Sequence, residues 1–276
     1  MKDAGARLIK ENYISAEQLH LAQQEAQGSG KSLLVALVKL GYLTEENVLI
    51  FLAQECGIPY LKLGNYLIRP ELSGILDEEF CRQNSIIPVF KINNRLFIAC
   101  ANPLDTMLID TIGRITGYEV ESLAASASSI NDALDLCYGK PDKNFELENF
   151  IFKPSSLKRL VFCRDSERQG LQIPVSIEIK DESVLTHPTL SMEGFTRNIS
   201  RGGTSIGLQL SLYLPPGIKI ALSFKPKQNI LSNSSDIIHA NGEVIYCLME
   251  KNLYYFIGVK FRDLSTNTRD RLIKLI

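Results

Sequence analysis

The sequence has little net charge and no long apolar run. It contains 30 Lys and Arg against 31 Asp and Glu, which gives a formal net charge of −1. This balance produces no overall field that would draw the protein to nucleic acid or to a membrane surface. No apolar run approaches the roughly 20 residues of a spanning helix, and residues 1–5 lack the apolar core of a signal peptide. We therefore expect a cytoplasmic protein without direct membrane insertion.

Cysteine and histidine are few and scattered. The six cysteines form no Cys-x-x-Cys pair, and none of the three histidines has a metal-ligand neighbour. Apolar surroundings, such as those of Cys100, indicate buried free thiols rather than a disulfide framework or a zinc site. No Ser/His/Asp set or pair of catalytic carboxylates emerges either. We predict that the protein has no metal and no cofactor, and that it is not an enzyme.

The first 60 residues contain an internal repeat. Residues 3–26 and 32–55 follow the same pattern: a short helix, a turn, and then Ser15 or Thr44 as the N-cap of a second helix. Apolar residues recur at helical spacing in each copy, so each helix has one buried stripe. The repeat predicts four helices, stacked as two hairpins.

The segment joining the two copies imitates part of a phosphate-binding loop. It reads Gly28-Ser29-Gly30-Lys31-Ser32, but a P-loop needs a glycine five residues before Gly30, and that residue is Glu25. A P-loop also follows a buried strand, whereas residues 19–26 are predicted to be helical. We interpret the segment as a link between helix hairpins, without a role in ATP hydrolysis.

Residues 61–139 change to alternating helices and strands. The turn signal Asn93-Asn94 separates two apolar strands, and Asn102-Pro103-Leu104-Asp105 starts a helix that runs to about Thr116. This pattern predicts a small α/β unit, with helices at 70–84, 102–116 and 128–138 and strands at 86–90, 95–100 and from 117.

The last third of the chain is dominated by short strands. Gly-, Pro- and Asn-rich breaks separate six of them, and an amphipathic helix follows at 265–276. The segment 181–192 is longer than a hairpin needs and is interpreted as an insertion or an exposed loop. The pattern predicts an antiparallel barrel with a terminal helix, its strands at 173–180, 194–200, 203–210, 217–224, 236–249 and 253–262.

A group of polar residues lies just before and inside this strand region. Arg164 and Arg168 are four residues apart, and guanidinium groups offer a donor fork that fits phosphate and the O6/N7 edge of guanine. Asn198 and Ser200 are two residues apart, so they are expected to share one strand face. Gly203 lies in the following turn, where glycine permits positive φ and close approach of a ligand.

Arg164-x-x-x-Arg168 followed by Asn198-x-Ser200-x-x-Gly203 resembles the sequence motifs of PilZ domains, which bind the bacterial second messenger cyclic di-GMP. The resemblance covers about residues 155–276. It implies that the two arginines close on the phosphates and guanine edges of the dinucleotide. It also implies that Asn198 and Ser200 hydrogen-bond the ligand from the barrel face, and that Gly203 lets the ligand lie close.

The N-terminal half resembles the MshEN domain, the N-terminal module of type II secretion and type IV pilus ATPases. The resemblance rests on the tandem repeat with its five-residue spacer, on Gly57-Ile58-Pro59-Tyr60-Leu61 and on residues 101–105. Some MshEN domains bind cyclic di-GMP through an opening Arg-Leu-Gly and a closing Gln in each copy.

This chain departs from the MshEN nucleotide-binding pattern at most of its positions. The opening arginines are replaced by Asp3 and Ser32, and the closing glutamines by Ala26 and Glu55. Gly5 is kept, while the second glycine is replaced by Leu34. Arg7 or Lys31 could act as displaced substitutes, but an acid at the opening position repels phosphate. We therefore expect the fold to be retained and the nucleotide site to be lost.

We predict an α+β protein with two domains. Residues 1–139 form the MshEN-like domain (1–60 helical repeat, 61–139 α/β unit), 140–158 a linker and 159–276 the PilZ domain. The expected function is a cyclic di-GMP receptor that relays binding, by domain reorientation, to a protein partner in secretion, pilus or motility machinery. One alternative is a ligand-independent adaptor, and another is a two-site receptor with an additional site in the MshEN-like domain.

Overall fold

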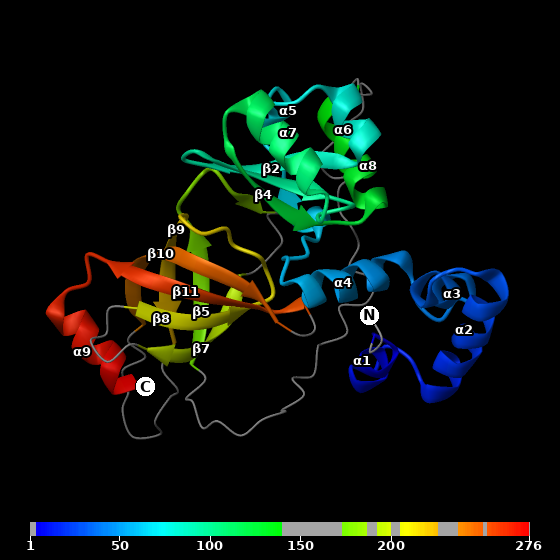
Figure 1. Ribbon diagram of the computed structural model, residues 1–276. Helices are drawn as coiled ribbons and strands as arrows, with labels where there is room; N and C mark the ends of the chain where they lie inside the picture. Colours follow the sequence, from blue (N-terminus) through cyan, green and yellow to red (C-terminus); the bar gives the residue numbers. More distant parts are fainter. Residues whose placement is uncertain are drawn as a thin grey trace. The chain divides into compact units, whose positions relative to one another are not determined.

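The computed structural model describes residues 4–139, 173–186, 192–199, 205–225, 237–250 and 253–275 (Figure 1). The chain divides into two compact units, Met1–Cys56 and Gly57–Ile276. The predicted linker, 140–158, lies outside the described residues, so the domain boundaries proposed on either side of it remain a prediction.

The first unit is the predicted helical repeat. Matching positions of the two copies have the same environment: Leu8 and Leu37 are fully buried. The residue two positions beyond the first helix of each copy adopts positive φ, 60° at Asn12 and 72° at Gly41. These shared features give four helices with a common core, namely α1 (Ala4–Lys10), α2 (Ala16–Ser29), α3 (Leu33–Lys39) and α4 (Glu45–Cys56).

Side-chain caps begin the second helix of each copy, as predicted. Ser15 accepts a hydrogen bond from the Gln18 amide, and the Gln18 side chain accepts one from the Ser15 amide at 2.8 Å. Thr44 accepts one from the Asn47 amide at 3.1 Å. Between the copies, Gly30 ends α2 with φ 66° and Ser32 caps α3. The segment that imitates a P-loop therefore contains the end of α2 and the connection to α3, and it is preceded by helix rather than by a strand.

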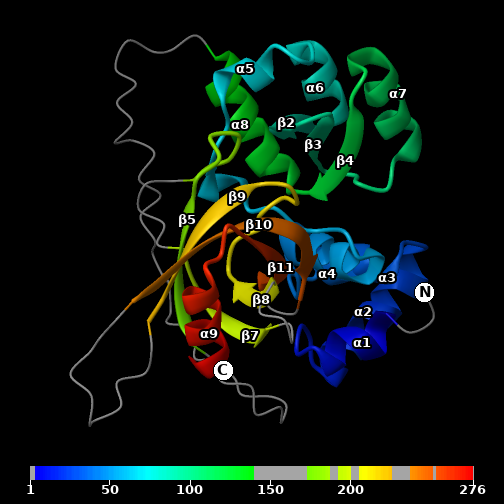
Figure 2. The ribbon, with the colours of Figure 1, turned by 90° about the vertical axis from the view of Figure 1, so that its left-hand side faces the viewer.

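The second unit consists of an α/β part, residues 57–139, and a barrel, and the α/β part contains a three-stranded sheet of order β2-β3-β4. Strand β2 (Ile86–Ile92) pairs antiparallel with β3 (Arg95–Cys100), and β3 pairs parallel with β4 (Glu119–Ala124). The crossover between β3 and β4 is α7 (Thr106–Thr116), whose first turn Asp105 caps at 3.0 Å. In Figure 2 the sheet lies between α7 and α8 (Ala127–Tyr138).

The predicted helix 70–84 is instead two helices, α5 (Pro70–Ser73) and α6 (Glu78–Asn84). Asp77 is the reason for the break, because its carboxylate accepts hydrogen bonds from the Glu79 and Phe80 amides and so begins a new helix.

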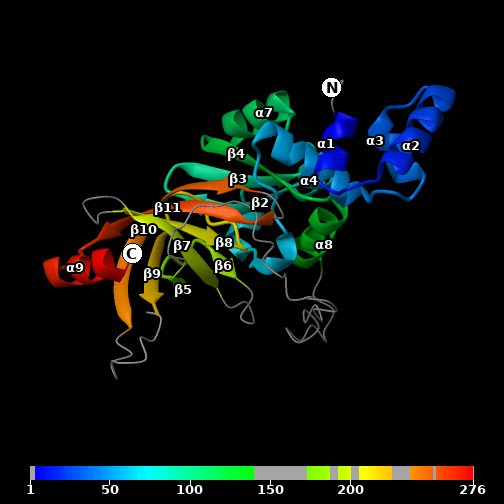
Figure 3. The ribbon, with the colours of Figure 1, turned by 90° about the horizontal axis from the view of Figure 1, so that it is seen from below.

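The predicted antiparallel barrel is confirmed. Its strands close in the order β10-β11-β8-β7-β5-β9, and α9 (Thr266–Leu275) packs against β10, beside the barrel in Figure 3. Inward side chains fill the barrel, among them Leu208, Leu222 and Ile257, all fully buried. The strands are β5 (Pro174–Ile179), β7 (Glu193–Ile199), β8 (Ser205–Leu210), β9 (Lys219–Phe224), β10 (Ile238–Met249) and β11 (Tyr255–Arg262).

The α/β part and the barrel share one hydrophobic core. Their buried side chains form a continuous cluster, in which the rings of Phe90 and Tyr213 stack with centroids 6.4 Å apart. The Tyr66 hydroxyl donates to the Tyr213 carbonyl at 2.9 Å, and Arg95 donates to the Pro216 carbonyl at 2.6 Å. Residues 57–139 and the barrel are therefore joined by buried contacts as well as by the chain.

The segment 181–192, expected to be an insertion or an exposed loop, contributes to this junction. Its short strand β6 (Leu185–Thr186) pairs antiparallel with β1 (Tyr66–Leu67) of the α/β part. Arg69 donates to the Glu182 carbonyl at 3.0 Å, and Val184 is buried. Residues 182–186 thus hold the barrel to the α/β part.

Within the ranges that the structure describes, no helix is both long enough and apolar enough to cross a membrane.

The shared core predicts that a change in the α/β part destabilises the barrel. Tyr66→Phe removes the buried hydrogen bond and leaves the Tyr213 carbonyl without that donor, which should lower the free energy of unfolding by about 1–3 kcal/mol. Urea unfolding followed by β-sheet circular dichroism should show a lower midpoint, with Tyr42→Phe in the helical unit as the control. An unchanged barrel transition in Tyr66→Phe would contradict the shared core.

Burial also predicts which thiols react. It raises the pKa of Cys81 to about 11 and those of Cys100 and Cys247 to about 12, whereas Cys56 is exposed. At pH 8 iodoacetamide should label Cys56 and leave these three intact, as peptide mass spectrometry can measure. The folded pKa values lie above the ordinary 9, so the folded state favours the neutral thiols. The stability that this preference gives is present below pH 9 and is lost as pH rises through 11–12. Rapid labelling of Cys247 at pH 8 would contradict its burial.

Candidate functional site

The structure describes one of the five predicted site residues. Asn198 lies near the end of β7, with its side chain exposed. Arg164, Arg168, Ser200 and Gly203 lie outside the described residues. The candidate site is therefore built from Asn198 and from the side chains around it on the barrel.

A β-bulge decides which way Asn198 points. Thr196 pairs with Leu208 and Asn198 with Gly207, so Arg197 is the extra residue between two consecutive pairs. Thr196 is fully buried, and its hydroxyl accepts a hydrogen bond from the Ile173 amide at 3.0 Å. Strict alternation would put Asn198 on the same face as Thr196. The bulge instead exposes both Arg197 and Asn198.

Two glycines lie side by side next to Asn198. Gly207 of β8 pairs with Asn198 on one side and with Gly258 of β11 on the other. A Cβ atom on Gly207 would collide with the Asn198 side-chain oxygen and lie 2.8 Å from the Phe256 ring, and one on Gly258 would collide with the Tyr246 ring. The glycines thus let the Asn198 side chain and two aromatic rings lie close to the strands.

The aromatic rings and a charged pair surround this position. The centroids of Tyr246 and Phe256 are 5.8 Å apart. The guanidinium carbon of Arg197 lies 5.5 Å from the centroid of Phe256, and its Nη1 atom donates to a Glu250 carboxylate oxygen at 2.6 Å. The outer barrel face therefore offers an amide, a guanidinium and two aromatic rings, groups that can bind a planar polar base or an anion.

Sequence reasoning missed Arg197 and its partners. Arg197 directly precedes the predicted Asn198, but alternation along a strand assigns neighbours to opposite faces. Glu250, Phe256 and Tyr246 belong to strands far along the chain, and only the closed barrel brings them to β7.

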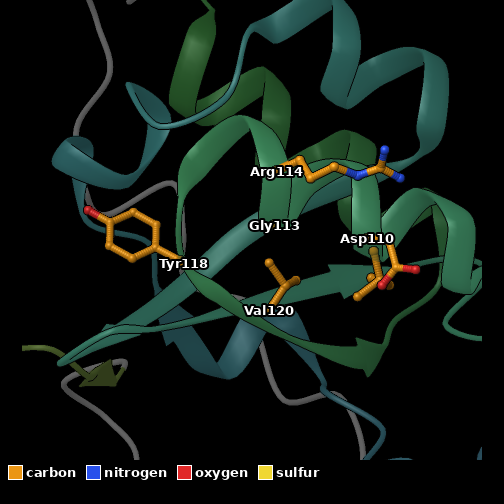
Figure 4. Close-up of a pocket in the computed structure, with 6 residues that line it drawn as sticks. Asp110, Gly113, Arg114, Tyr118 and Val120 are labelled. Carbon is orange, nitrogen blue, oxygen red and sulfur yellow. The ribbon is translucent and has the colours of Figure 1, made fainter.

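A second surface feature is a shallow hollow between α7 and β4 in the α/β part (Figure 4). In the figure, Asp110 and Arg114 reach toward one end of it and Tyr118 lies at the other, with Val120 between them. Gly113 also lines it. None of the predicted site residues contributes to this hollow.

The helical unit contains Arg7 and Lys31, the two residues considered as substitutes for the missing nucleotide-binding arginines. Arg7, considered as a displaced nucleotide ligand, forms an ion pair with Glu55, the residue that stands in place of the closing glutamine. The positive charge of Arg7 is thus matched within the unit itself. The structure describes Lys31 as well, between α2 and α3, with an exposed side chain.

Comparisons with protein families match two parts of the chain. The family described as the MshEN domain matches residues 56–144, and the family described as the PilZ domain matches residues 163–276. The chain combines an MshEN domain with a PilZ domain. This confirms both resemblances. The PilZ domain match contains all five predicted site residues, and the MshEN domain match begins at the end of α4.

Individual relatives match about half of the chain. The type IV pilus assembly ATPase PilB of Myxococcus xanthus is 30% identical over 142 residues, which are 51% of this chain and 25% of that protein. Type II secretion system protein E of Xanthomonas campestris is 28% identical over 138 residues, 48% of this chain and 24% of that protein. The matched region thus spans about a quarter of these relatives.

A solved structure of MshE with cdg is 26% identical, with a TM-score of 0.42, and the match covers 49% of this chain and 98% of that one. A structure of the N-terminal domain of XpsE is 28% identical, with a TM-score of 0.36, over 50% of this chain and 95% of that one.

The close packing at Gly207 gives a prediction for the site. Gly207→Ala would push its methyl group into Asn198 and Phe256, which should lower the free energy of unfolding by about 1–3 kcal/mol. Thermal unfolding of this variant should be compared with Gly64→Ala, where an added Cβ meets no atom within 4 Å. Equal stability of Gly207→Ala and the wild type would show that the glycine is not needed for this packing.

Proposed function

We propose that this protein is a receptor for cyclic di-GMP and binds it through the PilZ domain. Arg164, Arg168, Asn198, Ser200 and Gly203 are proposed to form the site. The observation that carries the proposal is the complete Arg-x-x-x-Arg and Asn-x-Ser-x-x-Gly pattern within the matched residues 163–276. The exposed Asn198, on an outer barrel face with polar and aromatic neighbours, supports it.

The chemistry of the ligand fits these residue types. Cyclic di-GMP is a symmetric dianion with two guanine bases, and guanidinium groups pair with both phosphate and the guanine O6/N7 edge. Each charge-assisted hydrogen bond contributes roughly 1.5–3 kcal/mol. Four or five such bonds total roughly 6–15 kcal/mol before ordering costs, a range that includes the roughly 8 kcal/mol of micromolar affinity. The proposed role is binding and signalling without catalysis.

The output is proposed to be an altered protein surface. The proteins that this chain resembles include pilus and secretion ATPases. We therefore propose that the chain docks on secretion, pilus or motility machinery in the cytoplasm. The core that residues 57–139 share with the barrel argues against a reorientation between those two parts. Any reorientation of domains is therefore proposed to involve the helical unit, residues 1–56, which has a core of its own.

Two alternatives remain distinct from this proposal. In a ligand-independent adaptor both domains would serve only to dock partners, and no titration with nucleotide would give heat. In a two-site receptor the helical unit would bind a second ligand near Arg7 or Lys31. The Arg7–Glu55 ion pair and the acidic Asp3 weigh against that second site.

Calorimetric titration with cyclic di-GMP tests the proposal. The wild-type protein should bind, and Arg164→Ala/Arg168→Ala should lose binding by at least about 100-fold, because two charge-assisted contacts are removed. Arg7→Ala serves as the matched control, since it removes one arginine of the helical unit, and it should leave affinity unchanged.

The outcomes separate the alternatives. Binding that survives the double substitution but falls in Arg7→Ala would overturn the PilZ assignment and move the site to the repeat. Absence of heat and of any thermal shift in the wild-type protein would favour the adaptor.

A further inference from the structure

We infer that Arg197 is a third arginine of the nucleotide site and that Glu250 competes with the ligand for it. The inference rests on the proposed function, because it extends the proposed cyclic di-GMP site along the outer barrel face. It adds a residue outside the Arg-x-x-x-Arg and Asn-x-Ser-x-x-Gly pattern, and it makes the affinity depend on an ion pair within the protein.

The bulge in β7 brings Arg197 to the site. Because Arg197 is the unpaired extra residue between Thr196 and Asn198, it leaves the strand on the same exposed side as Asn198. Two consecutive side chains, one amide and one guanidinium, therefore face outward together. A ligand phosphate or guanine edge held by Asn198 would lie within reach of the longer arginine.

Phe256 restricts where the Arg197 guanidinium can lie. The guanidinium carbon is 5.5 Å from the ring centroid, and the ring itself lies close above Gly207, where any Cβ would meet it at 2.8 Å. Gly207 is also the strand partner of Asn198. Phe256 thus keeps the guanidinium above the same pair of strands that carries Asn198, and it lowers the ordering cost of binding.

Glu250 forms an ion pair with Arg197 and so neutralises its charge. The Nη1–carboxylate distance is 2.6 Å, and the two side chains are 39% and 30% exposed. A pair that is this exposed is weak, so a dianion at the site can take over the guanidinium. A carboxylate so close to the anion also repels it, so Glu250 should lower affinity twice, by competition and by repulsion.

The experiment measures the affinity for cyclic di-GMP by calorimetry in a cycle of four proteins: the wild type, Arg197→Gln, Glu250→Gln and the double variant. Arg197→Gln should weaken binding about 10- to 100-fold. Glu250→Gln should tighten it about 2- to 5-fold. In the Arg197→Gln background the gain from Glu250→Gln should shrink, because the competition for the guanidinium is gone.

A second exposed ion pair on the barrel supplies the matched control. Arg262 and Glu243 pair across β11 and β10, and neither residue borders Gly207, Gly258 or Asn198 in the strand pairing. Arg262→Gln and Glu243→Gln make the same changes of charge away from the site, so they measure only the long-range electrostatic effect of the changed net charge. They should shift the affinity for cyclic di-GMP by less than about 2-fold. Circular dichroism melts of all variants exclude loss of fold.

The results separate this inference from the proposed function. If Arg164→Ala/Arg168→Ala abolishes binding while Arg197→Gln binds like Arg262→Gln, the PilZ site stands and the role of Arg197 is overturned. Equal effects of Glu250→Gln and Glu243→Gln would overturn the competition by Glu250. If the wild-type protein does not bind cyclic di-GMP, both claims fail.

Discussion

The buried junction between the α/β part and the barrel constrains the rest of the second unit. Tyr66 and Tyr213 meet there through a hydrogen bond from a fully enclosed hydroxyl, which costs free energy if its partner is lost. Burial also raises the pKa of both tyrosines well above the ordinary value, so they remain neutral. Because the same core contains inward residues of the barrel strands, the barrel and residues 57–139 stabilise each other.

The outer barrel face shows how a surface site and a stable fold share the same residues. Gly207 and Gly258 lack side chains on adjacent strands, which would leave sheet backbone uncovered. Phe256 and Tyr246 cover them with their rings, and in doing so they form the surface beside Asn198. Packing and recognition therefore depend on the same contacts, and a substitution at either glycine should affect both.

Much of the fold could be predicted from the sequence because its signals are local. The caps Ser15 and Thr44, the turn at Asn93 and the alternating strands each act within a few residues, and the structure has them as expected. The α5–α6 break was missed because Asp77 acts as a cap inside an otherwise helical pattern. The β1–β6 pairing was missed because a pair of two-residue strands, far apart in the chain, has almost no periodicity to detect.

The candidate site was predictable only in part. Motif spacing identified Asn198. The bulge, in contrast, arises because β7 has one residue more than β8 between two consecutive pairs, and this difference cannot be seen in the sequence of either strand alone. Thr196 contributes to the bulge by turning inward to accept the Ile173 amide. Arg197, Glu250 and Phe256 meet only once the barrel closes, so their association is a property of the tertiary structure.

Hydrogen–deuterium exchange with and without cyclic di-GMP tests the central claim most directly, because it reports on all parts of the chain at once. The ligand should slow exchange in peptides covering residues 163–170 and 193–210, whether or not exchange also changes in residues 4–56. Protection confined to residues 4–56, or no protection anywhere at saturating ligand, would contradict a PilZ-domain receptor.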